Sequence, residues 1–278
     1  MLSINPKEIS IGKLHGYLLG AVAPRPIAFA STIDEKGTPN LSPFSFFNVF
    51  GSNPPMMIFS PARRVRGNTT KHTLQNVEKI KEVVINVVNY DIVQQMSLSS
   101  SEYPEGVNEF EKAGFTMLPS DEVKPFRVLE SPVQFECKVT DIIYTGTGGG
   151  AGNLIVCEVV KIHIHEEVLD AEGMIDQYKI DLVARAGGSY YSRARDGFFE
   201  ISKPVFTLGI GVDQIPSAIR NSTVLTGNNL GMLGNITFLP TEQDVDNFTK
   251  EHPQFIGLEI VKKHTFAQQY LDNNDLES

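Results

Sequence analysis

The sequence predicts a mostly β protein whose strands close into a barrel. Three observations lead to this fold class: many short segments are rich in β-branched and aromatic residues, two longer segments alternate apolar and polar side chains, and the helical patterns between them are short. An antiparallel sheet with many strands removes its exposed edges most simply by closure. We therefore expect at least six strands in a closed or nearly closed barrel.

The first predicted strands form a hairpin near the start of the chain. Residues 27–33 are rich in β-branched and aromatic side chains and lead into a polar turn, 34–37, that ends in a glycine. Residues 40–50 continue as the second strand of this hairpin. After two prolines, 56–60 is a short apolar run bounded by another proline, which is typical of a buried strand.

One helix and a central strand follow the hairpin. In 73–80 the apolar residues repeat at helical spacing, and Thr69 or Thr70 is expected to cap this helix. Residues 83–88 are almost continuously apolar, as expected for a strand covered on both faces. The serine-rich segment 99–110 is polar, contains a proline and a glycine, and is predicted to be a loop.

Two long strands, 133–139 and 154–164, are joined by a glycine cluster at 146–152. Phosphate-binding loops also use glycines, because backbone N–H groups can then approach the phosphate, but such loops lie between a strand and a helix. Here the cluster separates two strands, and no Gly-Lys-Ser or Gly-Lys-Thr follows it. We therefore expect a mobile hairpin connection and not a phosphate cradle.

The C-terminal part of the chain has a different character. Beyond about residue 198 the strand pattern weakens, and a helix is predicted over 241–250 with Thr241 as its cap. We divide the chain into a barrel domain, 1–200, and a C-terminal extension, 201–278. The extension is expected to pack on the barrel or on a dimer of barrels.

Composition and charge exclude several classes of protein. Of the 278 residues, 41% are hydrophobic and 21% charged, as in a globular protein with a real core. The net charge is -9, and ten acidic against five basic residues from Glu200 onward supply more than half of it, so no nucleic-acid partner is expected. No apolar run is long enough to cross a membrane. Cys137 and Cys157 are too few for a disulfide scaffold and fit a cytoplasmic protein in which both are buried.

A locally basic segment stands out in this acidic chain. Arg63, Arg64, Arg66 and Lys71 lie within nine residues, just before the predicted helix at 73–80. Side-chain cations together with a helix N-terminus attract an anion such as a phosphate. A solvated run of charges explains the pattern equally well, so both interpretations stay open at this point.

Two further segments offer groups that could bind a ligand. Arg25 lies between two prolines that fix the backbone, as a rigid anion clamp requires, although a surface arginine at a strand entry fits as well. In 40–48, hydroxyl and amide side chains are mixed with aromatic rings, and strand alternation places Ser42, Phe44, Phe46 and Asn48 on one face. This mixture suits a flat heteroaromatic ligand. An aromatic core strand with satisfied polar groups is the alternative.

Several short motifs in a specific order and spacing are the basis of a family resemblance. They are Gly20 to Ala28, Asn40 to Asn48, Lys71 to Leu74 with Asn76, Phe110-Glu111 with Ala113-Gly114, Glu130 to Pro132 with Glu136-Cys137, and Arg185 to Gly188 with Tyr190-Tyr191. On these motifs the chain resembles the flavin reductase-like, FMN-binding split-barrel proteins. The similarity extends over about residues 15–195.

The resemblance implies a six-stranded Greek-key barrel with short peripheral helices, which forms a homodimer with one FMN per subunit near the dimer interface. It also implies that Lys71 and Thr73 lie near the FMN phosphate and Tyr190 near the flavin ring and the nicotinamide. The family's Lys-Asp-Thr element has His72 as its middle residue here, which departs from the pattern. The residues expected to bind the cofactor are Arg25, Ser31, Thr32, Asn40, Ser42, Ser45, Phe46, Asn48, Ser60, Arg64, Lys71, Thr73 and Tyr190.

By the same resemblance, the activity is that of an FMN-dependent oxidoreductase. It would take hydride from NADH or NADPH, bound transiently, and pass electrons to a flavin, to a small aromatic acceptor such as a quinone, or to a partner monooxygenase. A bound flavin carries out hydride transfer itself, so the protein needs no acid/base constellation, and its six histidines show no catalytic or metal-binding spacing. The alternative from another class is a non-enzymatic protein that stores or senses FMN.

Overall fold

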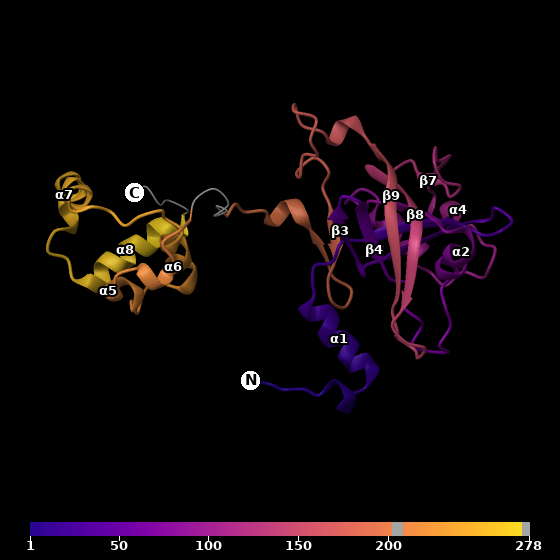
Figure 1. The fold of residues 1–278 in the computed structure, drawn as a ribbon, viewed down its shortest axis with the longest axis horizontal. Helices are drawn as coiled ribbons and strands as arrows, with labels where there is room; N and C mark the ends of the chain where they lie inside the picture. The colour runs from indigo at the N-terminus through magenta and orange to yellow at the C-terminus, as the bar shows by residue number, and fades with distance from the viewer. Residues whose placement is uncertain (202–207, 274–278) are drawn as a thin grey trace. The chain divides into compact units, whose positions relative to one another are not determined.

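The computed structural model describes residues 1–201 and 208–273 and divides the chain into two compact units, Met1–Phe198 and Phe199–Ser278. The N-terminal unit is built on an antiparallel sheet, and the C-terminal unit is helical (Figure 1). Among the described residues, no helix has both the length and the apolar character needed to span a membrane. The expected packing of the extension, 201–278, on the barrel or on a dimer stays a prediction.

The main sheet has the strand order β2-β1-β5-β8-β9-β4-β3, and all neighbours are antiparallel. Its strands are β1 (Ala28–Ile33), β2 (Pro39–Phe44), β3 (Phe47–Ser52), β4 (Pro55–Phe59), β5 (Glu82–Asn86), β8 (Val133–Tyr144) and β9 (Asn153–Ile164). Two short pairs lie outside it: β6 (Met117–Leu118) with β7 (Arg127–Val128), and β10 (Val183–Arg185) with β11 (Tyr191–Arg193). The mostly β class and both predicted hairpins are confirmed.

The segment 40–50 is not one strand, as its pattern predicts, but two. β2 ends at Phe44 and pairs with β1, whereas β3 begins three residues later and pairs with β4 at the other end of the sheet. Because the chain changes edge here, the alternation does not continue: Phe44 is buried, while Phe46 and Asn48 are exposed. The prediction that Ser42, Phe44, Phe46 and Asn48 lie on one face of a strand is therefore wrong. The main sheet also has seven strands instead of the expected six.

The sheet curls into a barrel that is not closed by hydrogen bonds. β2 and β4 lie near opposite ends of the strand order, yet the rings of Phe44 on β2 and Phe59 on β4 have centroids only 5.6 Å apart. The two edge strands, β2 and β3, form no ladder with each other in the described part of the chain. The expected closed, six-stranded Greek-key barrel is thus not confirmed, because side chains and not a strand ladder join the two ends of the sheet.

Short helices surround this barrel. They are α1 (Ile11–Ala21), α2 (His72–Ile80), α3 (Val93–Ser99) and α4 (Glu109–Ala113), with single 3₁₀ turns at Pro6–Glu8, Glu166–Val168 and Ala194–Gly197. Helix α1, which the sequence pattern did not predict, lies outside the barrel and has no buried residue (Figure 1). Helix α2 packs against β1 and β2, and α3 and α4 pack against β2 and each other.

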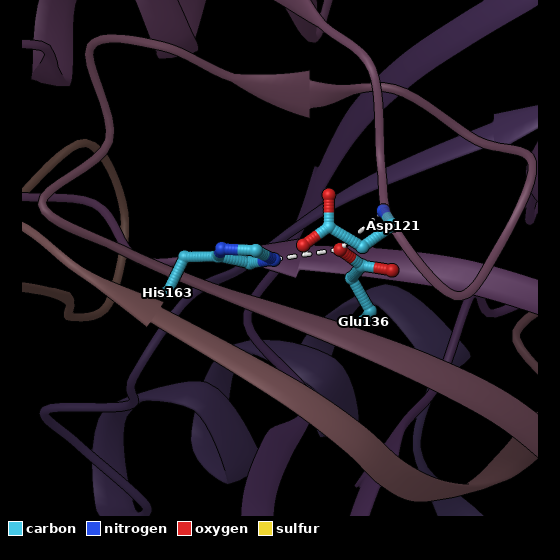
Figure 2. Close-up of side chains that lie close together, drawn as sticks. All are labelled: Asp121, Glu136 and His163. Carbon is cyan, nitrogen blue, oxygen red and sulfur yellow. Dashed lines mark hydrogen bonds and ion pairs between the residues drawn. The ribbon is translucent and has the colours of Figure 1, made fainter.

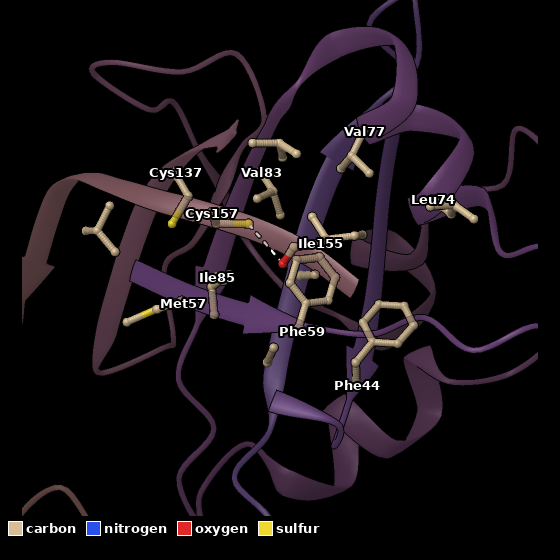
Figure 3. Close-up of a cluster of buried hydrophobic side chains, with 14 residues drawn as sticks. Phe44, Met57, Phe59, Leu74, Val77, Val83, Ile85, Cys137, Ile155 and Cys157 are labelled. Atoms are coloured by element: carbon tan, nitrogen blue, oxygen red, sulfur yellow. Dashed lines mark hydrogen bonds between the residues drawn. The ribbon is translucent and has the colours of Figure 1, made fainter. Parts of the chain in front are cut away.

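Three hydrophobic clusters hold the N-terminal unit together, and the two largest join its helices to the sheet. The first fills the barrel with side chains from six strands and one face of α2, including Phe59 and Leu74 (Figure 3). Cys137 and Cys157 belong to this cluster as free, buried thiols, as expected. The second cluster, which contains Phe29, lies between the other face of the sheet and helices α3 and α4. Each fully buried side chain of this size stabilises the fold by about 1.5–3 kcal/mol, so the clusters fix α2 and α4 against β1 and β2.

The C-terminal unit consists of α5 (Ser217–Arg220), α6 (Gly227–Gly234), α7 (Glu242–Glu251) and α8 (Ile260–Asp272), with 3₁₀ turns at Val212–Gln214 and Pro253–Phe255. The helix predicted over 241–250 is confirmed as α7. Thr241 Oγ1 accepts the N–H of Asp244, and the Asp244 carboxylate accepts the N–H of Thr241 in return. The predicted cap by Thr241 needs only a residue three positions away, which is why the sequence could predict it, and the structure adds the return bond to Asp244.

Candidate functional site

One polar pocket in the N-terminal unit gathers five of the residues that were predicted to bind a cofactor. It lies between the start of α2, strand β2 and the segment that follows α3, and its volume is about 20 Å³. Cations, hydroxyls and amides converge here, which is chemistry that suits an anion. The predicted residues that line the pocket are Asn40, Ser42, Arg64, Lys71 and Thr73, and the others are His72, Ser99, Ser100, Ser101, Glu102, Tyr103 and Glu109.

Buried polar side chains from three elements form a hydrogen-bond network beneath the pocket. Asn40 Nδ2 on β2 donates to Thr73 Oγ1 on α2 at 3.0 Å and to Thr32 Oγ1 on β1 at 3.2 Å. Asn76 Nδ2, also on α2, donates to the same Thr32 oxygen at 3.0 Å. The network ties α2 to the β1–β2 hairpin. Because Thr73 Oγ1 acts as an acceptor here, its own O–H remains able to donate to a ligand.

Arg64 and Lys71 supply the positive charge of the pocket. Arg64 Nη1 donates to Thr69 Oγ1 at 3.0 Å and to the Thr70 carbonyl oxygen at 2.9 Å, so the loop before α2 holds the guanidinium in place. Burial lowers the pKa of the half-buried Lys71 ammonium, the charge of Arg64 lowers it further, and Glu102 opposes both. Within the described residues Lys71 Nζ donates no hydrogen bond. This cation can therefore accept an anionic ligand without losing an existing partner.

The cap predicted for the helix at 73–80 is wrong. Helix α2 begins at His72 with Lys71 in the cap position, and no side chain caps it. The hydroxyls of Thr69 and Thr70 instead accept from Arg64 and, at 2.9 Å, from the side chain of Gln75. The first backbone N–H groups of α2 are thus left without a side-chain acceptor beside the pocket, where they add to its positive potential.

The glycine cluster at 146–152 positions the arginine-rich loop. Gly150 N donates to the carbonyl oxygen of Arg63 at 3.0 Å, and Arg63 N donates to the carbonyl oxygen of Ala151 at 2.9 Å. A Cβ atom on Gly149 would lie 2.8 Å from the carbonyl oxygen of Val65, closer than side chains tolerate. The connection between β8 and β9 is a hairpin, as predicted, and close packing against the arginine loop explains the glycine at position 149.

Arg25 uses its guanidinium to hold backbone in place. Nη1 donates to the carbonyl oxygens of Leu19, at 2.8 Å, and Val22, and Nη2 donates to that of Ala186 at 3.2 Å. Burial lowers the pKa of Arg25, and the charge of Arg185 lowers it further. Most of its donors are therefore engaged in joining the end of α1 to the segment after β10. A contact between Arg25 and a flavin stays a prediction.

The other predicted residues lie outside the pocket. Ser31 Oγ is buried and has no hydrogen-bond partner among the described residues. Ser60 Oγ is also buried and accepts the N–H of Asn153 at 3.0 Å. Ser45 is half-buried at the edge of the Arg25 guanidinium, 3.5 Å from its Nε. The exposed members of the predicted set are Phe46, Asn48 and Tyr190.

The sequence pattern gives no decisive sign of the part of the pocket that follows α3. The segment 99–110, predicted to be a loop, is one except at its ends, where α3 finishes and α4 begins. From this segment Glu102 Oε1 accepts from Arg64 Nε at 2.8 Å, across a sequence separation of 38 residues. Glu109 Oε2 accepts the N–H of Leu41 at 3.0 Å. Burial raises the pKa of Glu109, and the hydrogen bond from the N–H of Leu41 lowers this pKa by a smaller amount. The only available signal was a run of three serines before an acid, because the partners lie far away in the sequence.

A second polar cluster lies on β8, β9 and the loop between β6 and β7. Ligand atoms of Asp121, Glu136 and His163 lie within 4.8 Å of one another, a set that could bind a metal ion (Figure 2). Glu136 Oε1 accepts from His163 Nε2 at 2.6 Å and from Asp121 N at 2.9 Å, and Oε2 accepts the next two backbone N–H groups at 2.6 and 3.2 Å. Lys161 Nζ lies 2.7 Å from Asp121 Oδ2. The acceptor positions of Glu136 are thus filled, and we interpret this cluster as structural.

Comparison with known proteins shows where the chain has relatives. Residues 20–183 match the family model of the flavin reductase like domain. An uncharacterized protein of Aquifex aeolicus is 38% identical over 188 residues, which cover 68% of this chain and 93% of the relative. All residues that line the pocket fall within the matched region, and unit Phe199–Ser278 falls outside it.

Two solved structures share the fold of the N-terminal unit. Nitrilotriacetate monooxygenase component B from Bacillus cereus superposes with a TM-score of 0.66 at 27% identity and covers 73% of this chain and 98% of its own. A 2-nitrobenzoate 2-nitroreductase from Pseudomonas fluorescens gives a TM-score of 0.66 at 26% identity and covers 76% of this chain and 100% of its own. The split-barrel resemblance read from the motifs is therefore confirmed.

Proposed function

The chain belongs to the flavin reductase-like domain family, and from this membership we propose that it is an FMN-binding oxidoreductase of the flavin reductase type. In this proposal it takes hydride from NADH or NADPH, which bind transiently, and passes the electrons to a flavin or a small aromatic acceptor. The observation that carries the proposal is the pocket at the start of α2. There Arg64, Lys71 and Thr73 present the cations and the hydroxyl that a phosphate monoester requires.

The donors of the pocket fit the phosphate of FMN. Lys71 Nζ has no acceptor among the described residues, and Thr73 keeps an O–H to donate. The side chains that line the pocket are almost all polar or charged, which suits a phosphate and not a flavin ring, so we assign only the phosphate to this pocket. The orphaned hydroxyl of Ser31, buried in β1, is a second group for which a bound ligand or water could supply a partner.

The residues of this chain have binding and orienting roles in the proposal. When bound, FMN supplies the hydride-transfer chemistry. Arg64 and Lys71 neutralise the phosphate charge, and Asn40 holds the hydroxyl oxygen of Thr73, a residue that also lines the pocket. No side chain is required to move a proton, which agrees with the lack of an acid/base pattern in the sequence.

Two relatives support the proposed range of electron acceptors. One is component B of a nitrilotriacetate monooxygenase, which supports transfer of reduced flavin to a partner monooxygenase. The other is a 2-nitrobenzoate 2-nitroreductase, which supports a small aromatic acceptor. Anaerobic turnover of this protein with a panel of flavins, quinones and nitroaromatics would separate these acceptors.

We also propose that the protein is a cytoplasmic homodimer. In α1 no residue is buried, and Ile11, Leu18 and the adjacent Val22 are 54%, 54% and 63% exposed. On β9, Ile162 is 51% exposed. Apolar surface of this kind is buried when a second copy associates, and free thiols fit a reducing compartment. A monomer in size-exclusion chromatography with light scattering would contradict the dimer.

Two measurements test the proposed function. Purified protein is first mixed with FMN. If the protein retains no flavin absorbance and does not quench the fluorescence of the flavin, the whole proposal is contradicted. NADH or NADPH is then added without oxygen, and loss of the absorbance of the bound flavin is expected for a reductase. A bound flavin that neither nucleotide bleaches would instead favour the alternative, a protein that stores or senses FMN.

A further inference from the structure

The acid that closes the anion pocket is Glu102, which comes from the segment after α3. Its Oε1 accepts from Arg64 Nε at 2.8 Å, the one strong ionic contact that Arg64 makes in the described residues. Arg64 and Glu102 both line the pocket that we assign to a phosphate. The carboxylate therefore occupies a donor that a bound phosphate would also use.

Glu102 interacts with both cations of the pocket. Its hydrogen bond with Arg64 and the charge of Arg64 lower its pKa most, and the charge of Lys71 lowers it further. The other titratable groups that line the pocket are His72, Tyr103 and Glu109, and the Glu109 carboxylate already accepts the N–H of Leu41. Glu102 is thus the acid whose negative charge compensates Arg64 and Lys71 in this structure.

The two partners of this ion pair differ in how firmly they are held. The Arg64 side chain is 24% exposed and is also bound to Thr69 and Thr70, whereas the Glu102 side chain is 69% exposed. An exposed carboxylate can rotate into water at little cost, because surface ion pairs contribute little to stability. Arg64 can therefore exchange one anion for another without moving itself.

We propose that Glu102 is an internal competitor for the ligand's phosphate, whose carboxylate holds Arg64 until a phosphate monoester displaces it. This inference rests on the proposed function and adds a selectivity device to it. A dianionic phosphate gains more from two cations than a monoanion does, so it displaces Glu102 where a carboxylate or chloride does not. Ligands that lack a phosphate, such as riboflavin, gain nothing from this displacement.

The test compares Glu102→Gln with the wild-type protein by titration with FMN and with riboflavin, followed by quenching of flavin fluorescence. Removal of the competitor is expected to tighten FMN binding about two- to fivefold and to leave riboflavin binding unchanged. Glu105→Gln is the matched control, since Glu105 is an exposed acid of the same segment that does not line the pocket. Unchanged or weaker FMN binding in Glu102→Gln overturns the inference.

A double-mutant cycle separates competition from a general change in charge. In an Arg64→Ala background the gain from Glu102→Gln is expected to shrink to the smaller part that comes from the charge of Lys71, because no guanidinium remains to compete for. A gain as large as in the wild-type background overturns the inference. If the wild-type protein binds no FMN, the proposed function fails. The competitor role is then tested by titrating the same variants with orthophosphate, with binding followed by nuclear magnetic resonance. Equal orthophosphate affinities in wild type and Glu102→Gln then overturn the competitor role by itself.

Discussion

The two polar clusters of the N-terminal unit both bring charged side chains of opposite sign together, and they differ in how completely these groups are paired. The cluster on β8 and β9 contains Asp121, Glu136 and His163, and the acceptor positions of Glu136 are filled. The pocket at α2 contains two cations, of which Lys71 donates no hydrogen bond in the described part of the chain. Arg64 there is held by an acid that is mostly exposed.

This difference shows that converging charged residues do not by themselves make a binding site. Glu136 is buried and accepts four donors, so a metal ion would have to displace bonds that already satisfy the carboxylate. In the pocket, a ligand can engage Lys71 and Thr73 without displacing any partner of Lys71. Unused hydrogen-bonding capacity therefore separates the functional candidate from the structural cluster.

The largest expected effect is on stability, from Glu136→Gln. Burial alone would raise the pKa of Glu136, but the N–H groups of Asp121 and Glu122, together with His163, outweigh it and lower the pKa. The carboxylate therefore stabilises the fold above its ordinary pKa of 4.5, and this contribution is lost as the pH falls through the lowered value. We expect the variant to lose about 3 kcal/mol in the free energy of unfolding at pH 7.

Urea unfolding followed by circular dichroism measures this loss. Glu158→Gln is the control, because Glu158 lies on β9 outside the cluster. The loss should shrink on acidification, since the wild-type carboxylate then loses its advantage. A Glu136→Gln protein as stable as the control would show that the closed cluster contributes little and would weaken the comparison between the two clusters.

The next largest effect is on ligand binding, from Lys71→Ala. The ammonium of Lys71 donates no hydrogen bond within the described residues and can bind an anion, whereas the ammonium of Lys161 is already paired with Asp121. We expect Lys71→Ala to weaken FMN binding about tenfold, which corresponds to one charged hydrogen bond. Lys161→Ala should leave FMN binding unchanged, and neither change should alter riboflavin binding. Equal FMN affinities for the two variants in a fluorescence titration would refute the phosphate assignment.

A smaller effect is expected from Glu109→Gln at the pocket wall. Burial raises the pKa of Glu109 above its ordinary 4.5, so its ionised form costs stability once the pH exceeds the raised value and costs nothing below 4.5. Glutamine keeps an oxygen to accept the N–H of Leu41. We expect a gain of less than about 1 kcal/mol at pH 7, because the open pocket screens the charge, and no gain near pH 4.

Thermal unfolding at the two pH values measures this gain. The control is Glu111→Gln, an exposed change on the same helix. A variant that is less stable than wild type at pH 7 would mean that the Glu109 carboxylate is favourably ionised, as Glu136 is. The pocket would then be closer to a satisfied cluster than the comparison assumes.

The smallest effect is expected from ending the chain at Phe198. Every residue that lines the pocket belongs to unit Met1–Phe198, and the family match also ends within it. The shortened protein should therefore bind FMN with unchanged affinity. Light scattering of the same protein asks whether dimerisation needs the extension. A marked loss of FMN affinity would show that the C-terminal unit contributes to binding.

The sequence predicted those parts of the fold that depend on neighbouring residues. The β8–β9 hairpin, the central strand β5 and the capped helix α7 follow from alternation, apolar runs and a cap three residues away. The cap of α2 was predicted wrongly, because Arg64 and the side chain of Gln75 compete for the threonine hydroxyls. A local pattern cannot show that competition.

The site was predictable to the extent that its residues lie in recognisable motifs. The strand motif around Asn40 and the basic segment with Arg64, Lys71 and Thr73 do line one pocket. Phe46 and Asn48 do not line it, because the chain moves to the other edge of the sheet after Phe44. Tyr190 does not line it either, since it lies between β10 and β11, outside the main sheet. The serines at 99–101 and Glu102 gave no decisive signal, since their partners are distant in sequence.

The sequence by itself thus determined the class of fold, the family and the supply of positive charge for an anion, because these depend on local pattern and composition. Only the tertiary structure decided the number of strands, the open seam of the barrel and the pairing state of each charge. Those properties depend on which groups meet across long sequence separations, and burial then sets whether a charged group keeps unused hydrogen-bonding capacity. That capacity distinguishes Lys71, which we expect to bind a ligand, from Glu136, which stabilises the fold.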